Sequence, residues 1–276
     1  MYQPDPFRAP VASSRHRSAH PLRAIAGAIR WEFVIGFLIL IGFFMVVLWL
    51  DDPRWRTPGT VGLVLVGWVF SVCLHEFGHA ATAYLAGDHS DGTVSYLSFD
   101  PRHYLHPVLS VLLPVLFIIM GGLPLPGGAV YLRRDLVRSR VWQSAISLAG
   151  PAMSLLVALL IAVPFLLVPE TLGAHPVLED ALAFLAFLEI GAVLFNLLPL
   201  PPLDGYGVIS PWLPQDIQQG AMAFANYGIL LIFVLFVAVP GMSVFFFETV
   251  YRILIPLQID PFAAFTGYSI FRFWQQ

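Results

Sequence analysis

The residues with the clearest chemical meaning are His75-Glu76-Phe77-Gly78-His79, which lie within an apolar stretch that begins near Val61. Two histidines four residues apart on a helix project from one face and can share a Zn²⁺ ion. The glutamate beside the first histidine can take up a proton from water. This pattern predicts zinc-dependent hydrolysis, and its position where a membrane helix is expected places the reaction inside the bilayer.

A hydrolytic zinc site needs three protein ligands and an open position for water, so a third ligand must come from elsewhere. The candidates are the acidic residues in or beside apolar segments, namely Glu189, Asp204 and Glu248. The sequence around Asp204 favours it, because the prolines at 199, 201 and 202 lack a backbone N–H and stop the preceding helix. Non-helical backbone at membrane depth is tolerated against protein or a water-filled cavity, which suits a metal ligand.

Two further polar residues complete the predicted chemistry. Zinc lowers the pKa of its bound water toward ~7, and Glu76 is the predicted general base, which takes the proton and later gives it to the leaving amine. Asn196 is a predicted hydrogen-bond donor to the oxyanion of the tetrahedral intermediate or to the substrate backbone. Glu189 lies seven residues before Asn196, on roughly the same helix face, where we expect a supporting or structural role.

These motifs together resemble the site-2 protease family of intramembrane zinc metalloproteases. Its members pair an HExxH helix with a later helix that ends in a P-x-x-D-G-like segment, matched here by Asn196-Leu-Leu-Pro-Leu-Pro-Pro-Leu-Asp204-Gly205 about 120 residues downstream. Between them the family has a glycine-rich membrane loop, matched by Gly127-Gly128-Ala129-Val130, and an A-G-P helix start, matched by Ala149-Gly150-Pro151.

The resemblance covers roughly residues 60–210. It implies His75, His79 and Asp204 as the ligands of one zinc ion per chain, Glu76 as the base and Asn196 as an assisting group. After Gly-Pro the family often has an asparagine where this chain has Ser154. The remaining length holds no PDZ or CBS module, which is typical of a compact bacterial form.

The composition identifies an integral membrane protein. Of the 276 residues, 58% are hydrophobic and only 11% are charged, whereas soluble domains carry about 25% charged residues. The length suits one all-α polytopic domain of about six transmembrane helices at roughly 20 residues each. The single cysteine, Cys73, excludes an intrachain disulfide and a zinc site built from several cysteines. The sequence has no nucleic-acid-binding motif, and the lipid bilayer is the expected surrounding.

Apolar segments define the predicted organisation. Residues 1–30 are predicted as a flexible cytoplasmic tail, 31–257 as the intramembrane metalloprotease domain and 258–276 as a short cytoplasmic C-terminal tail. The predicted spans are 33–50, 61–86, 141–168, 181–200, 221–239 and 242–257. The spans at 61–86 and 181–200 run in the same direction, so their polar residues can meet at similar depth.

The segment 107–126 is apolar but short, whereas a span needs at least about 17 residues. If it crossed the membrane, the four arginines between 133 and 140 would lie outside the cytoplasm. If it dips in and returns, they join most other arginines inside, as the positive-inside bias favours. We therefore predict a re-entrant, β-hairpin-like membrane loop at 107–126 and place both termini in the cytoplasm.

The functional prediction is a zinc-dependent intramembrane endopeptidase in the bacterial cell membrane. Its expected partner is a transmembrane protein or peptide, cleaved near the cytoplasmic leaflet in regulated intramembrane proteolysis. The alternative is a catalytically silent metal-binding scaffold of the same fold, and the intact Glu76 argues against it because a structural metal site needs no base. A transporter is less favoured, because residues 61–86 and 181–205 do not mirror each other as inverted halves would.

Overall fold

The computed structural model describes residues 20–104, 136–137, 139–225, 227–228, 234–236 and 238–275. Every regular element among these residues is a helix, and they contain no strand. The predicted all-α class is therefore confirmed for the described part of the chain. The predicted loop at 107–126, the glycine-rich segment 127–130 and most of the predicted N-terminal tail lie outside the described residues.

Three helices are long and apolar enough to cross a membrane, namely α2 (Trp31–Trp49), α3 (Arg56–Leu85, directly after the turn η1, Pro53–Trp55) and α7 (Arg140–Leu167). They coincide with the segments predicted as spans at 33–50, 61–86 and 141–168 and confirm that these are long apolar helices. Local sequence explains their ends. The Ser139 hydroxyl accepts the Trp142 N–H at the start of α7. Gly87 follows the end of α3 with a φ of 104°, a left-handed conformation that glycine adopts without strain.

The other helices are α1 (Pro21–Ala28), α4 (Asp91–Tyr96), α5 (Pro101–Tyr104), α8 (Pro169–Gly173), α9 (Pro176–Asn196), α10 (Asp204–Ile209), α11 (Gln215–Ala225), α13 (Met242–Leu254) and α14 (Pro261–Phe271). Of these, α13 with its terminal turn (Ile255–Leu257) and α14 qualify as one span only as a pair, and the pair is bent by 118°. The described residues thus contain three candidate spans, or four with the bent pair, where the sequence predicts about six.

Helix α9 occupies the segment predicted as a span at 181–200, but it is not among the helices that are apolar enough to cross a membrane. It is 21 residues long and buried over most of its length, but it contains Glu179, Asp180 and Glu189 and so is not apolar enough to count as a span. A helix surrounded by other helices can carry acidic groups that a lipid-facing helix cannot. The predicted span at 221–239 lies partly outside the described residues, and α11 covers its beginning.

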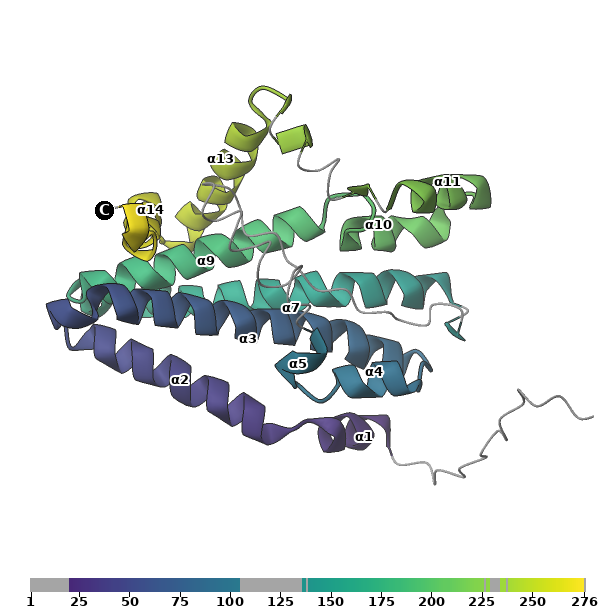
Figure 1. Cartoon of the computed structure of the whole chain (residues 1–276), viewed down its shortest axis with the longest axis horizontal. Helices are drawn as coiled ribbons and strands as arrows, with labels where there is room; N and C mark the ends of the chain where they lie inside the picture. The colour runs from purple at the N-terminus through teal and green to yellow at the C-terminus, as the bar shows by residue number, and fades with distance from the viewer. Residues whose placement is uncertain are drawn as a thin grey trace, which may run out of the picture.

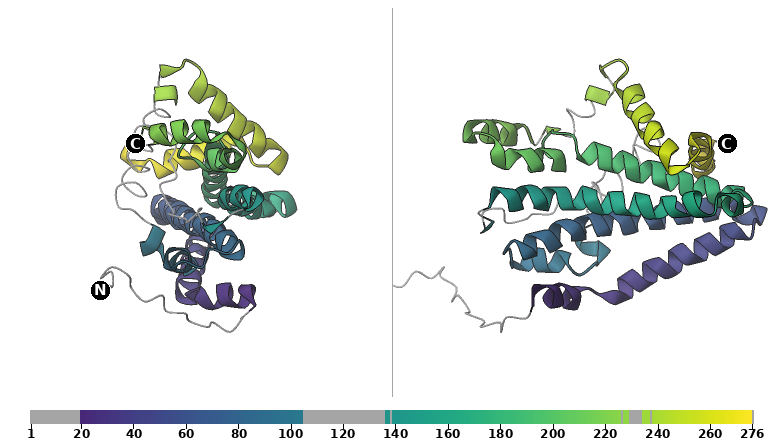
Figure 2. Two further views of the ribbon diagram at one scale, coloured as in Figure 1. Left: turned by 90° about the vertical axis from the view of Figure 1, so that its right-hand side faces the viewer. Right: turned by 180° about the vertical axis from the view of Figure 1, so that it is seen from behind.

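The long helices α2, α3, α7 and α9 lie side by side along the long axis of the molecule (Figures 1 and 2). In chain order they alternate in direction, so that α3 and α9 run the same way and α2 and α7 run against them (Figure 1). Helix α3 packs against both α7 and α9. The C-terminal ends of α3 and α9 therefore meet at one end of the bundle, beside the start of α7 and the short helix α10.

Helix α14, within the region predicted as a C-terminal tail, packs across the beginning of α9 (Figure 1). A Cβ atom at Gly267 would overlap the Asp180 carbonyl oxygen, so the glycine allows this close crossing. At the other end of the chain, α1 forms within the predicted N-terminal tail. Its Ile25 packs with Ala80 of α3 and with Leu97.

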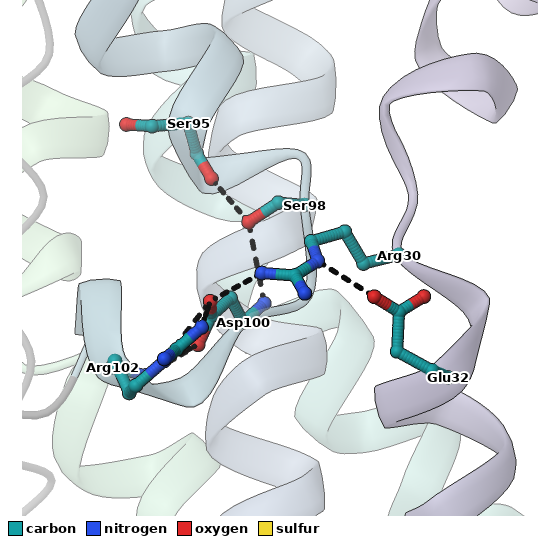
Figure 3. A network of polar contacts seen from close by, with 6 residues as sticks. All are labelled: Arg30, Glu32, Ser95, Ser98, Asp100 and Arg102. Carbon is teal, nitrogen blue, oxygen red and sulfur yellow. Dashed lines mark hydrogen bonds and ion pairs between the residues drawn. The ribbon is translucent and has the colours of Figure 1, made fainter.

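A polar network holds the start of α2 against the segment that follows α3 (Figure 3). The Arg30 N–H donates to the Ser98 carbonyl oxygen at 2.9 Å. The Arg30 guanidinium lies 3.0 Å from the buried Asp100 carboxylate, which Arg102 contacts at 2.6 Å. Arg30 also pairs with Glu32 at 2.8 Å. Because Asp100 receives two guanidinium groups, its burial is compensated, and the network fixes α1 and α2 beside the end of α3.

Candidate metal centre

His75, His79 and Asp204 converge between α3 and the start of α10. The His75 Nε2 atom lies 3.1 Å from Asp204 Oδ2 and 3.1 Å from His79 Nε2, and His79 Nε2 lies 3.3 Å from Asp204 Oδ1. Two ligands that each sit about 2.1 Å from a tetrahedral Zn²⁺ are about 3.4 Å apart. The three residues therefore fit a zinc ion, and they form the only such group of His, Cys, Asp and Glu side chains in the described part of the chain.

The second ring nitrogen of each histidine is engaged by α7. His79 Nδ1 lies 2.6 Å from the Ile146 carbonyl oxygen, which can only accept a hydrogen bond, so this nitrogen is the donor. His75 Nδ1 lies 3.1 Å from the Ser154 hydroxyl oxygen. A hydrogen bond from Nδ1–H leaves the Nε2 lone pair free to bind a metal and fixes the orientation of the ring. Ser154 thus supports His75, at the position where the family pattern has asparagine.

The spacing of these contacts follows the pitch of α7. Ile146, Gly150 and Ser154 are four residues apart and lie on the face of α7 that packs against α3. Gly78 lies opposite, where a Cβ atom would approach the Ala149 carbonyl oxygen to 2.8 Å. The two glycines let the helices approach closely, as small residues do at membrane helix crossings. A Cβ atom at Gly150 would overlap the Nε2 atoms of both histidines.

We expect Gly150→Ala to weaken zinc binding at least ~10-fold, because the added methyl group must displace the ligating rings and their hydrogen bonds to α7. Competitive zinc titration of the purified protein measures the effect. Gly36→Ala in α2, where no atom lies within 4 Å of the added Cβ, is the matched control. Equal zinc affinity in the two variants would contradict the placement of the rings over Gly150.

Asp204 reaches the histidines because the chain folds back over the end of α9. The backbone turns between Leu197 and Leu203, and a Cβ atom at Gly205 would overlap the Leu197 carbonyl oxygen. Burial opposes ionisation of Asp204, but the His79 and His75 rings outweigh burial and hold the pKa of the carboxyl well below its usual range. Asp204 is therefore ionised, which is the form that binds a metal ion.

Glu76 and Asn196 line a cavity of about 40 Å³ beside the metal centre, together with His75, Ser154, Glu189, Trp68, Ser71, Val72 and Ala192. Both Glu76 and Asn196 are buried. Among the described residues, no hydrogen-bond partner is present for the Asn196 Nδ2 atom. A base, a free N–H donor and the candidate ligands thus share one small polar space, as hydrolysis of a bound peptide requires.

Three other sequence predictions can be placed. Glu248, an alternative third ligand, is exposed on α13 and pairs with Arg252 at 3.5 Å, away from the histidines. Glu189 lies on the cavity wall rather than with the ligand atoms. The A-G-P motif that the family resemblance describes as a helix start lies inside α7, which begins at Arg140 as the predicted span at 141–168 indicates. Pro151 is accommodated within the helix because neighbouring groups in a packed bundle can satisfy the carbonyl that it frees.

Sequence reasoning missed the supporting contacts from Ile146 and Ser71. Ile146 acts through its backbone carbonyl, which leaves no signal in residue type. Ser71 lies four residues before His75, one turn along the same face of α3, and this spacing could have indicated it. Its hydroxyl donates to Glu189 Oε2 at 2.5 Å.

Comparisons with known proteins agree with this geometry. The chain is 41% identical over 237 residues, 82% of its length, to a Mycolicibacterium smegmatis protein named "Putative zinc metalloprotease Rip2", of which the match covers 87%. A Mycobacterium tuberculosis protein of the same name is 40% identical over 216 residues, 78% of this chain and 82% of that protein. A Bacillus subtilis protein named "Putative zinc metalloprotease YwhC" is 31% identical over 180 residues, 63% of this chain and 79% of that protein.

No protein-family model matches the chain, and no solved structure matches it. The family assignment rests on the full-length relatives together with the motifs that the structure assembles. The relatives' names support a metalloprotease role and imply zinc as the metal. The chain belongs to the site-2 protease family of zinc metalloproteases.

Proposed function

We propose that this protein is a zinc-dependent endopeptidase that hydrolyses a peptide bond of membrane-spanning substrates near the cytoplasmic leaflet, as in regulated intramembrane proteolysis. One observation carries the proposal. His75, His79 and Asp204 converge beside a cavity that Glu76 and Asn196 also line, and His75, His79 and Glu76 belong to a helix long and apolar enough to span a membrane. The names of the relatives support the metalloprotease part of the proposal.

His75, His79 and Asp204 would hold the zinc ion, which when bound would polarise the scissile carbonyl and acidify the attacking water. Glu76 accepts a proton from that water as its oxygen bonds to the carbonyl carbon. Asn196 donates its free Nδ2–H to the carbonyl oxygen as negative charge develops there. When the C–N bond breaks, Glu76 returns the proton to the leaving nitrogen, so that the base is regenerated and one water is consumed.

Burial of the site implies that the substrate must enter between helices. A peptide bond within an intact helix is shielded by its own hydrogen bonds, so the substrate span must unwind locally before it can reach Glu76. We also propose six spans, a re-entrant loop at 107–126 and two cytoplasmic termini. In this topology the HEFGH end of α3 faces the cytoplasm, as the arginine distribution favours.

The proposal is tested by reconstituting the protein in liposomes with a panel of single-span substrates. We expect cleavage that a zinc chelator abolishes and that added Zn²⁺ restores, with the cut mapped by mass spectrometry to the cytoplasmic half of the substrate span. Variants of the substrate with a helix-breaking residue near the cut should be cleaved faster. Cleavage that resists chelation, or a cut confined to soluble parts of the substrate, would refute the proposal.

A further inference from the structure

The cavity beside the metal centre continues past it along α9. Its wall on that helix is formed by Glu189, Ala192 and Asn196, which are three and four residues apart and so share one face. Asn196 lies at the metal end, and Glu189 lies seven residues earlier, about 10 Å back along the helix axis. The opposite wall lies on α3 and extends from Glu76 back to Trp68, eight residues earlier. The polar space therefore extends away from the ligands, toward the beginnings of α3 and α9.

Glu189 is the polar group at this far end, and the mechanism above does not use it. Its side chain is 1% exposed. One carboxyl oxygen, Oε2, accepts the Ser71 hydroxyl at 2.5 Å, whereas Oε1 has no hydrogen-bond partner among the described residues. A buried polar atom left without a partner is costly, so a carboxyl oxygen facing a cavity calls for a ligand within that cavity.

Water is the ligand that fits this space. A cavity of about 40 Å³ is large enough for roughly two or three water molecules, since one needs about 10–15 Å³. The walls offer hydrogen-bonding groups on several sides, from Ser71, Glu76, Ser154, Glu189 and Asn196. A polar cavity of this size between two buried carboxyl groups holds ordered water rather than remaining empty.

We propose that Glu189, braced by Ser71, holds ordered water in the cavity next to Glu76 and thereby positions the water consumed in hydrolysis. Glu189 acts through water and Glu76, which makes it a positioning residue. Each cut consumes one water, and this arrangement places the next one beside the base. The inference rests on the proposed peptidase function for its effect on turnover, but the water site itself can be tested separately.

A purely structural role for Glu189 and a water-holding role predict different effects of Glu189→Leu on stability. If the Glu189–Ser71 hydrogen bond served only to join α9 to α3, replacing Glu189 with leucine would lower stability. If Glu189 serves to hold water, Glu189→Leu removes an unpaired buried oxygen and fills the cavity with apolar atoms. Glu189→Leu leaves the Ser71 hydroxyl able to donate instead to the carbonyl oxygen four residues earlier in α3, so no buried donor is left unpaired. Stability is then kept or raised while the cavity loses its water and turnover falls.

The test compares full-length wild type, Glu189→Leu and Glu189→Gln by four measurements: thermal melting, zinc content, cleavage kinetics, and X-ray footprinting of Trp68 by radicals formed from adjacent water. For Glu189→Leu we expect turnover to fall ~10- to 100-fold because the attacking water is misplaced. KM and zinc content stay unchanged, melting temperature is unchanged or higher, and Trp68 labelling falls relative to Trp142. Glu189→Gln keeps an oxygen acceptor and should stay within about threefold of wild type.

Each outcome has a defined meaning. Turnover and Trp68 labelling at wild-type levels in Glu189→Leu would overturn the inference. A lower melting temperature together with lower zinc content in both variants would also overturn it, because that result indicates a structural role. Inactive Glu189→Gln with normal Trp68 labelling would also overturn it, because a proton-transferring carboxyl would then be required. If wild type cleaves no substrate but labelling and melting follow expectation, the peptidase proposal fails and the water site stands.

Discussion

Glu76→Gln is expected to lower peptide-bond cleavage by ~10²- to 10⁴-fold, the usual contribution of a general base, while zinc content stays at the wild-type level. The glutamine amide has nearly the same shape as the carboxylate but cannot accept the proton of the attacking water. Zinc is retained because Glu76 lines the cavity and is not one of the three converging ligand residues. Metal analysis and single-turnover cleavage of one reconstituted preparation measure both quantities.

Glu170→Gln is the matched control, since Glu170 is exposed at the beginning of α8 and is far from the cavity residues in the sequence. It should leave zinc content and cleavage unchanged. Retained activity in Glu76→Gln would remove Glu76 from the role of base. Loss of zinc together with activity would instead make Glu76 part of the metal site. A silent scaffold, the alternative function, predicts that neither variant changes any rate, because wild type would show none.

His75, His79 and Asp204, which the sequence proposes as ligands, lie together in the structure, and the spacing of each pair of residues within one segment accounts for much of this. Histidines four apart on a helix share a face, and the proline-rich segment after Asn196 ends α9 before Asp204, which begins α10. The meeting of the two segments followed from their common direction, and the structure places His75 Nε2 3.1 Å from Asp204 Oδ2. Long apolar runs likewise predicted α2, α3 and α7.

The contacts that hold the site are not local, and the sequence did not reveal them. Gly150 and Ser154 act on the histidines only because α7 crosses α3 at Gly78, and the crossing point depends on the packing of whole helices. The same packing explains why Ala149-Gly150-Pro151 lies inside α7 rather than at its beginning. A proline normally marks a helix end, but in a packed bundle α7 continues through it.

Helix α9 was difficult for a different reason. Hydropathy reports how apolar a segment is, and not what surrounds it, so a helix buried by protein can carry three acidic residues and still lie at the centre of the bundle. One of those residues, Glu189, lies on the wall of the cavity. The departure from an apolar pattern in α9 therefore coincides with a polar wall of the cavity beside the candidate ligands.

Asp204 differs from the other two candidate ligands in its position in the chain. His75 and His79 both lie on α3, whereas Asp204 begins α10, beyond the end of α9. Binding of Zn²⁺ to all three residues thus joins α3 to the α9–α10 connection. The convergence of ring nitrogens and carboxylate also means that Asp204 supplies the only negative charge within the ligand set. Its replacement should affect metal affinity more than any other conservative change in the site.

We expect Asp204→Asn to weaken zinc binding by at least ~100-fold, because the amide oxygen is a neutral and poorer ligand at unchanged shape. Cleavage should vanish at limiting zinc and recover in part at saturating zinc, since Glu76 and Asn196 are untouched. Partial recovery distinguishes this variant from Glu76→Gln, which no zinc concentration restores. Asp216→Asn, on the exposed part of α11, is the matched control. Wild-type zinc affinity in Asp204→Asn would show that the third ligand is another residue. The variant whose cleavage is restored by added zinc identifies the metal ligand, and the variant whose cleavage is not restored identifies the group that transfers the proton.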